Sequence, residues 1–139
     1  MAETAPKTVV NLAWEDGLRF TATHRGQSWT LDGRNEAGPS PVILLASSVA
    51  GCMAIDIVHI LTKGRHKVAA LDTEFSGVRA DTDPKRFTRI DLLFTVQTNA
   101  SQEAVERAIE LSHEKYCSVW HSMRQDIEFH TGVEIRPLA

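Results

Sequence analysis

The first third of the chain is organised by an alternation of apolar and polar residues. The alternation runs through residues 18–23 and again through residues 28–32, and its period of two is typical of strands with one buried face. An apolar run at residues 8–14 precedes them, and turn residues separate the three segments. This pattern predicts a three-stranded meander with one solvent-exposed face, followed by a polar loop over residues 32–39.

A long apolar segment follows this loop and predicts a helix from Pro41 to about Lys63. Ser40 is a favoured N-cap residue and proline is favoured at the first helical position, while Gly64 predicts the C-terminal end. The segment is apolar nearly all round over its first four turns, which is typical of a helix covered on most sides. We therefore expect this helix to pack on a sheet and against a second helix, such as its twin in a dimer. Small residues that permit such an approach recur along it, at Ala46, Ala50, Ala54, Ser47 and Gly51.

The most apolar stretch, from Val42 to Leu61, has the length of a membrane span. A span needs about 20 residues with few or no charges. This stretch contains polar and titratable residues at Ser47, Ser48, Asp56 and His59. We interpret it as a buried helix of a water-soluble protein and expect no membrane partner.

The second half of the chain returns to strand-like alternation and then to a helical period. The pattern predicts strands over residues 68–78 and 87–97, a helix from Asn99 or Ser101 to about Tyr116, a short helix or turn over 117–124, and a strand over 127–135. The order of elements is βββ-α-ββ-α-(α)-β. It predicts an α+β fold.

The composition indicates one globular domain. The chain has 139 residues, of which 42% are hydrophobic and 24% charged, so it can bury a core without metal or disulfide support. We expect a single domain over residues 1–139. Lys and Arg total 15 against 18 Asp and Glu, for a formal charge of −3, and there is no basic excess to bind nucleic acid.

Two features indicate the compartment. Residues 1–7 lack the basic start and apolar run of a signal peptide. The chain has two cysteines, Cys52 and Cys117, which excludes a disulfide-rich secreted scaffold and a four-cysteine zinc site. We expect a cytoplasmic protein, in which cysteines serve as core residues, metal ligands or reactive thiols.

Cys52 lies in the middle of the predicted helix among apolar neighbours. One interpretation is a small core residue, because cysteine is among the most buried residue types. The other is a reactive thiol, since Ser48, Asp56 and His59 share its helix face. His59 is two turns away, about 10 Å along the axis, which is too far for a direct cysteine–histidine pair. Asp56, one turn away, disfavours a thiolate unless a cation intervenes.

Cys117 lies at a predicted helix end. If it begins the following short helix, the helix dipole favours its thiolate; the alternative is a half-buried structural cysteine. The pairs His113 with Cys117 and Cys117 with His121 have the spacing of metal ligands, but neither comes with a third and fourth ligand. We therefore expect neither a metal nor another cofactor.

Three motifs together resemble the OsmC/Ohr family. They are the helix start Pro39-Ser40-Pro41, the segment Ala50-Gly51-Cys52-Met53-Ala54-Ile55-Asp56 inside the long helix, and the later segment Glu114-Lys115-Tyr116-Cys117-Ser118-Val119. The order of elements agrees over nearly the whole chain. The resemblance implies an OsmC-like α+β fold, built as an intertwined homodimer in which antiparallel sheets wrap two central helices and the active sites lie at the dimer interface.

The resemblance also implies an activity. Members of the family with known activity are cysteine peroxidases that reduce organic hydroperoxides, and some reduce hydrogen peroxide. By this similarity Cys52 is the attacking cysteine and Cys117 the resolving one, an external dithiol restores the thiols, and the role is in the oxidative stress response. A thiolate that attacks a peroxide becomes a sulfenic acid, which a second thiol converts to a disulfide.

One departure from the family pattern concerns the activation of the thiol. Peroxidase members place a glutamate about ten residues before the first cysteine, where it holds an arginine over the thiolate. In this chain, the residues after Pro41 are Val42, Ile43 and Leu44. Arg19 and Arg34 are the candidate arginines, and neither lies in a family motif. Without a cation, burial disfavours the thiolate of Cys52.

Three functions stay open at this point. The first is the two-cysteine peroxidase. The second is a non-catalytic redox sensor or a binding protein for a small apolar ligand, which would need the apolar helix but not the carboxylate. The third is a structural or interaction protein whose cysteines serve only packing, because a fold does not fix a function.

Overall fold

The computed structural model describes residues 5–139, which divide into two compact units, residues 5–45 and residues 46–139. The expectation about a signal peptide extends to residues 1–4, which lie outside the described residues. The two units are described separately below.

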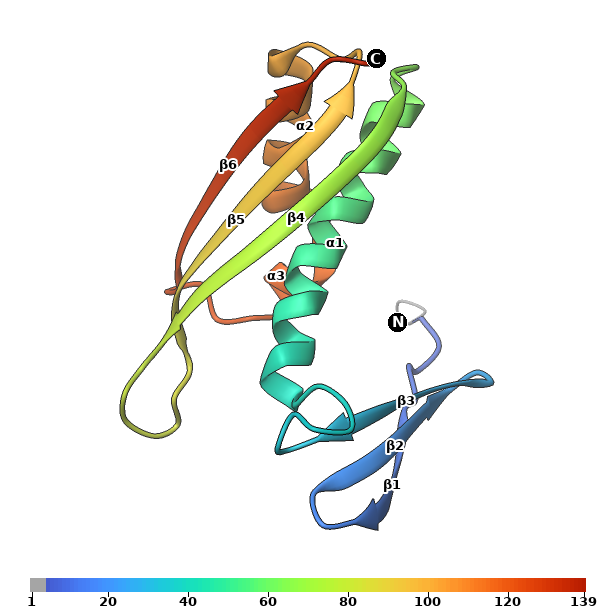
Figure 1. The fold of residues 1–139 in the computed structure, drawn as a ribbon, viewed down its shortest axis with the longest axis vertical. Coiled ribbons are helices and arrows are strands. Elements are labelled where there is room, and N and C mark those ends of the chain that lie inside the picture. Colours follow the sequence, from blue (N-terminus) through green and yellow to red (C-terminus); the bar gives the residue numbers. More distant parts are fainter. Residues whose placement is uncertain (1–4) are drawn as a thin grey trace, which may run out of the picture. The chain divides into compact units, whose positions relative to one another are not determined.

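The first unit contains the predicted three-stranded meander. Its strands are β1 (Asn11–Asp16), β2 (Arg19–His24) and β3 (Gln27–Asp32), which form an antiparallel sheet in that order (Figure 1). The first strand begins at Asn11 rather than at residue 8. All residues of β1 are exposed. The apolar run at residues 8–14 therefore does not mark a buried strand, and it did not predict where β1 begins to pair with β2.

Asp32 organises the loop that follows β3. The residue is 2% exposed, and its carboxylate accepts hydrogen bonds from the backbone N–H groups of Arg34 and Ala37, each 2.9 Å long. The guanidinium of Arg19 lies 3.6 Å from the same carboxylate. These donors, the Ala37 N–H first, lower the pKa of Asp32. The loop is therefore a fixed structure built on one buried carboxylate.

The long helix α1 (Pro41–Lys63) has the predicted bounds, but its two ends differ in detail from the prediction. The Ser40 backbone carbonyl accepts the first helical hydrogen bond from Leu44, whereas the buried Ser40 hydroxyl has no hydrogen-bond partner among the described residues. At the C-terminal end, the left-handed conformation falls on Arg65 (φ 68°) and not on Gly64. The His66 N–H bonds to the Leu61 carbonyl and closes this turn.

One face of α1 is buried and another is exposed. Val49, Met53 and Ile57 are fully buried, whereas Ile55 is 70% and Val58 39% exposed. Within a single chain the helix is therefore covered on one face, and its expected contact with a twin helix in a dimer stays a prediction. A Cβ atom at Gly51 would meet no atom from outside this part of the helix within 4 Å, so no second helix within residues 5–139 packs there.

By length and composition alone, α1 is the one helix within residues 5–139 that could cross a membrane. Those two properties are shared by core helices of soluble proteins, and 22% of its most apolar window is buried here. The buried face of α1 packs within the second unit, as expected for a core helix.

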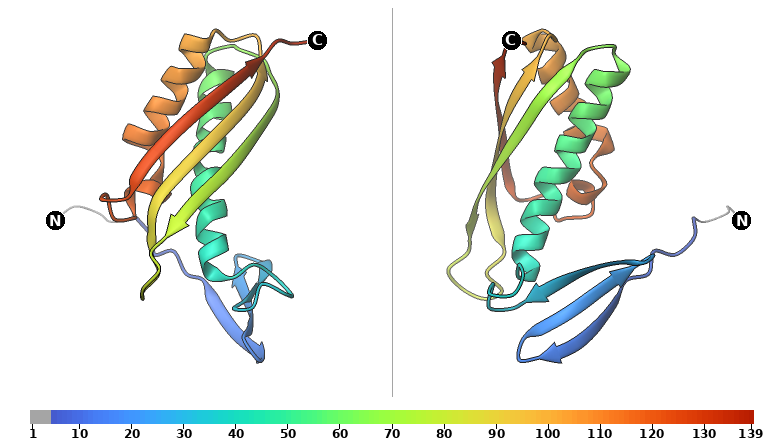
Figure 2. Two further views of the ribbon diagram at one scale, coloured as in Figure 1. Left: turned by 60° about the vertical axis from the view of Figure 1, so that its left-hand side comes forward. Right: turned by 45° about the vertical axis from the view of Figure 1, so that its right-hand side comes forward.

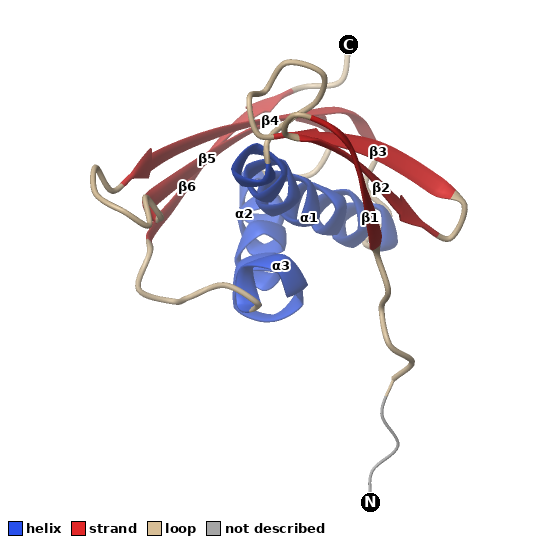
Figure 3. Cartoon of the chain, turned by 90° about the horizontal axis from the view of Figure 1, so that it is seen from below, coloured by secondary structure: helices blue, strands red, loops and turns tan. Residues whose placement is uncertain are grey.

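The second unit is built on a sheet of β4 (Val68–Arg79), β5 (Phe87–Thr98) and β6 (Glu128–Arg136). β4 and β5 are antiparallel, whereas β5 and β6 are parallel. Parallel neighbours need a crossover connection, which α2 (Gln102–Leu111) and the segment after it provide. Helices α1 and α2 lie on the same face of this sheet (Figures 2 and 3).

The core lies between these helices and the sheet. β5 turns alternate residues inward, and Ile90, Leu92, Phe94 and Val96 are at most 1% exposed. Helix α2 begins at the predicted cap, since the Ser101 side chain accepts a hydrogen bond from the Ala104 N–H. The predicted α+β order of elements is confirmed.

The prediction of one helix up to Tyr116 is wrong in its last turn. Regular α-helix ends at Leu111, and residues Ser112–Tyr116 form a π-helix, η1. A four-residue helix, α3 (Ser118–His121), follows directly. The change of helix type redirects the chain at Cys117.

Candidate active site

Helix α1 carries the first predicted site residue. Cys52 is half-buried, and Asp56 follows it by one helical turn on the same face. Both positions belong to the part of the helix that packs within the second unit.

The junction of η1 and α3 holds the second predicted site residue. Cys117 is fully buried and is the N-cap of α3. Its backbone N–H donates to the Ser112 carbonyl over 2.8 Å, and its sulfur accepts a hydrogen bond from the Trp120 N–H over 3.4 Å. The backbone and the side chain of Cys117 are thus both fixed.

Ser112 joins this junction to α1. Its side chain is fully buried, and its hydroxyl donates a 2.7 Å hydrogen bond to a carboxylate oxygen of Asp56. The same residue therefore binds the backbone of Cys117 through its carbonyl and the helix of Cys52 through its hydroxyl. This connection holds the two cysteine-bearing segments together.

The two thiols are neighbours, although 65 positions separate them in the sequence. Burial raises the pKa of Cys117 to about 11, and the Trp120 N–H opposes this shift. The adjacent Cys52 thiol raises the pKa further through a hydrogen bond and through its charge, and Asp56 adds a smaller contribution. Both cysteines are reduced.

The short helix acts on Cys117 in the expected direction, because the Trp120 N–H lowers the pKa of the thiol, but burial raises it by more. The position at the start of α3 is as predicted, but the gain from one N–H donor is smaller than the cost of burying a thiolate. The thiol of Cys117 is therefore protonated at neutral pH.

An aromatic cluster supports α3 beside the site. The rings of His113 and Phe129 stack with centroids 4.8 Å apart, and Trp120 lies 4.5 Å from Phe129. His121 bonds through its ring to the His113 carbonyl, over 2.9 Å. The two histidines that had metal-ligand spacing to Cys117 thus serve packing and backbone contacts, and no cluster of three or more ligating residues occurs within residues 5–139.

Two cavities open beside α1. One, of about 550 Å³, begins at Asp56 and is lined by Asp56, His59, Ile60, Lys63, Gly64, Leu111 and Tyr116. The other, of about 510 Å³, is lined by Ala54, Ile55, Val58, His59, Thr62 and Leu71. The first cavity combines an apolar wall with polar groups, as small-molecule sites commonly do.

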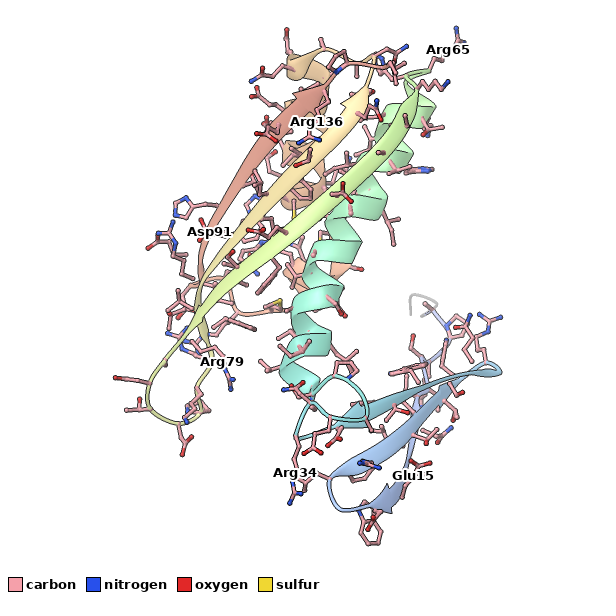
Figure 4. The ribbon with its side chains drawn as sticks, viewed as in Figure 1. Glu15, Arg34, Arg65, Arg79, Asp91 and Arg136 are labelled. Carbon is pink, nitrogen blue, oxygen red and sulfur yellow. The ribbon has the colours of Figure 1, made fainter. Side chains whose placement is uncertain are left out.

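The two candidate arginines lie in the first unit. Arg19 pairs with Asp32, and Arg34 lies in the loop after β3 (Figure 4). Which arginine serves the thiols stays a prediction. Sequence reasoning missed Ser112, because a serine within a predicted helix carries no signal that its hydroxyl reaches another helix.

Several known proteins are similar to this chain in sequence, in fold or in both. The sequence model of the family described as OsmC-like protein matches residues 33–132. Protein YhfA of Escherichia coli K12 is 38% identical over 109 residues, which cover 76% of this chain and 81% of YhfA. A crystal structure of a protein from Aquifex aeolicus VF5 aligns with a TM-score of 0.89 and 26% identity, over 97% of this chain and 100% of that one. An organic hydroperoxide resistance protein from Elizabethkingia anophelis aligns with a TM-score of 0.69 over 97% of this chain and 100% of that one. Its 14% identity shows a shared fold alone.

Proposed function

Because this chain belongs to the OsmC-like protein family, we propose that it is a thiol-dependent peroxidase that reduces organic hydroperoxides. The predicted family and its α+β fold are confirmed by the family match and by the solved structures. The observation that carries the proposal is the interaction between the thiols of Cys52 and Cys117, which are remote in the sequence. We assign the activity to the oxidative stress response.

The reaction needs no group beyond the two thiols and their substrates. The Cys52 thiolate attacks the terminal oxygen of the hydroperoxide, the O–O bond breaks, and the alkoxide takes up a proton and leaves as the alcohol. Cys52 becomes a sulfenic acid. The Cys117 thiol then attacks that sulfur, which forms a disulfide and releases water. An external dithiol reduces the disulfide and is itself oxidised.

The exposure of the two cysteines supports their assigned roles. Cys52 is half-buried, so a peroxide can reach its sulfur, whereas Cys117 is fully buried. The raised pKa of Cys117 keeps it protonated and therefore poorly nucleophilic towards a peroxide. Cys52 is the attacking residue in this proposal, and Cys117 resolves the sulfenic acid.

We further propose that the chain acts as a cytoplasmic homodimer and that residues 1–139 form one OsmC-like domain. The exposed apolar side chains Ile55 and Val58 on α1 support a partner on this face, since large apolar groups there would otherwise contact water. A second copy of the chain is the partner that the family resemblance implies.

The proposal is tested with purified protein, a dithiol and either cumene or tert-butyl hydroperoxide. We expect peroxide consumption by the wild type, none by Cys52→Ser, and one turnover without a disulfide by Cys117→Ser. Peptide mass spectrometry of the oxidised wild type should identify a Cys52–Cys117 crosslink. Absence of both turnover and crosslink would refute the peroxidase.

The second candidate is a redox sensor or a binding protein for a small apolar ligand. The cavity of about 550 Å³ beside Asp56, with Ile60 and Leu111 in its wall, favours it. The residues Val42–Leu44 in place of the family glutamate favour it as well. Native mass spectrometry decides: a bound molecule that stays on the protein in the absence of turnover supports this function, and an empty protein counts against it.

A further inference from the structure

The cavity of about 550 Å³ beside α1 takes no part in the proposed thiol chemistry. One of its walls is the C-terminal half of α1, which contributes Asp56, His59, Ile60 and Lys63. The last three follow Asp56 by three, four and seven positions, so all four lie on one face of the helix. The volume lies in the range of about 300–1,000 Å³ that is common for small-molecule sites.

The opposite wall of the cavity comes from the end of α2 and from η1. Leu111 contributes an apolar side chain, and Tyr116 at the end of η1 completes this wall. The two walls are joined where Asp56 lies, because the Ser112 hydroxyl donates a 2.7 Å hydrogen bond to the Asp56 carboxylate. The cavity is therefore held open between two segments that a hydrogen bond fixes to each other.

Three polar side chains of the lining are free to bind a ligand. The Lys63 ammonium, the His59 ring and the Tyr116 hydroxyl form no hydrogen bond or ion pair within residues 5–139. Each of these groups can donate a hydrogen bond, and the lysine also carries a positive charge. A carboxylate or sulfonate, which accepts several hydrogen bonds and is negatively charged, is the kind of group that such donors bind.

The charged residues of the lining lie at opposite ends of the cavity. Asp56 is its one acidic residue, and one carboxylate oxygen is already bonded to Ser112. Lys63 follows Asp56 by seven positions, about 10 Å along the helix axis. An anion bound at Lys63 is thus separated from the carboxylate, and the side chain of Ile60 lies between the two ends.

The end of α1 reduces the electrostatic cost of an anion there. The negative end of the helix dipole lies near Lys63 and would repel an anion. Three of the last helical carbonyls, however, accept hydrogen bonds from N–H groups of the turn over residues 64–66. Arg65 adds a positive charge to the same turn. The cavity is therefore cationic at one end, apolar in the middle and acidic at the other end.

We propose that this cavity binds a small organic anion, with a carboxylate or sulfonate group at Lys63 and His59 and an apolar body beside Ile60. The body then extends towards the end of the cavity that lies one helical turn from Cys52. Binding needs neither a peroxide nor a cysteine, so this site goes beyond the peroxidase. It also changes the ligand class of the second candidate function from a wholly apolar molecule to an amphiphilic anion.

The test compares two probes with the same apolar body, naphthalene-1-acetate and naphthalene-1-acetamide, of which only the first is an anion at neutral pH. Isothermal titration calorimetry of the wild type should give an affinity for the acetate that is about threefold to fivefold higher, the value of an ion pair with an exposed lysine. The preference should shrink at high salt, because exposed charges are screened. Equal affinities for the two probes, or no binding, overturn the proposal.

Three variants locate the bound charge. Lys63→Gln should remove most of the preference for the acetate, and Lys63→Arg should keep it. Lys67→Gln removes the same charge four residues further along, outside the lining, and should leave both affinities unchanged. Both lysines are exposed, so their replacement leaves the core intact. Equal losses in Lys63→Gln and Lys67→Gln, or a Lys63→Gln protein that still prefers the acetate, overturn the proposal.

Amide NMR signals show where the probe binds. The acetate should shift the signals of Ile60, Leu111 and Tyr116, and shifts confined to Ile55 and Leu71, which line the other cavity, overturn the assignment. No measurement uses a peroxide, and both cysteines stay in place. Peroxide turnover by a protein that binds the two probes equally would refute this site alone, and a preference for the acetate without turnover would refute the peroxidase alone.

Discussion

The Ser112 hydroxyl donates a 2.7 Å hydrogen bond to the Asp56 carboxylate and so joins the end of the α2–η1 segment to the middle of α1. These two residues are 56 positions apart, and the serine is fully buried. Through this bond, the segment that ends at Cys117 is held beside the helix that carries Cys52. We therefore expect the arrangement of the two cysteines to depend on this bond.

We expect Ser112→Ala to lower the free energy of unfolding by about 1–3 kcal/mol, because it leaves a partly buried carboxylate without its donor. It should also slow the formation of the Cys52–Cys117 disulfide. Urea denaturation and quenched alkylation measure the two effects. The control is Ser122→Ala, which removes an exposed hydroxyl bonded to the Ser118 carbonyl. Equal destabilisation by the two variants would show that the Ser112–Asp56 bond has no special role.

The high pKa of Cys117 makes stability depend on alkaline pH. A thiol whose pKa is near 8.5 when unfolded and about 11 when folded binds a proton in the folded state over this range, while the unfolded state has lost it. Its contribution is fully present below pH 8.5 and is lost as the pH rises towards 11, a fall of about 3 kcal/mol. Denaturation at several pH values measures the fall, and Cys117→Ser should lack this part of it. An identical pH dependence in the two proteins would contradict the assignment.

Asp32 should make the first unit sensitive to acid. Its pKa is lowered in the folded state by N–H donors, so its contribution to stability is present above the ordinary value near 3.9 and is lost as the pH falls through the folded value. Asp32→Asn should remove this acid dependence and loosen the loop at residues 33–39. Amide hydrogen exchange of Arg34 and Ala37 reports on the loop. Asp81→Asn, an exposed change, is the control, and unchanged exchange in Asp32→Asn would refute the role of the carboxylate.

A charged residue on the exposed side of α1 should prevent the contact between two copies of the chain. Ile55 is 70% exposed, so Ile55→Asp leaves the core of a single chain intact while it opposes an apolar contact between two copies. We expect the variant to be a folded monomer in light scattering at a concentration where the wild type is a dimer. Leu93→Asp, on an exposed position of β5, should remain dimeric. A dimeric Ile55→Asp would place the interface elsewhere.

The sequence predicted most accurately the elements whose formation depends on residues close together in the chain. The bounds of α1 followed from Pro41 and the end of an apolar run, and β5 followed from strict alternation. The sequence predicted less well those segments whose residues are compatible with more than one backbone conformation. Nothing in the sequence of residues 112–116 distinguishes a π-helix from an α-helix, and the positive φ expected at Gly64 fell on Arg65.

The site was predictable in its residues but not in its geometry. Spacing alone left Cys52 and Cys117 as either packing or reactive residues, and only the family resemblance suggested that they meet. Their proximity depends on contacts between distant parts of the chain, such as the Ser112–Asp56 bond, which no local pattern encodes. The sequence did not indicate that Asp56, one turn from Cys52, also acts on Cys117.

The parallel pairing of β5 with β6 affects the order in which parts of the fold can form while the chain is being synthesised. The crossover between these strands contains Cys117, and β6 follows it in the sequence. A nascent chain that already exposes Cys52 still lacks the third strand that closes the crossover. The two cysteines can therefore meet only after synthesis has passed Cys117, and until then Cys52 is a thiol without its counterpart.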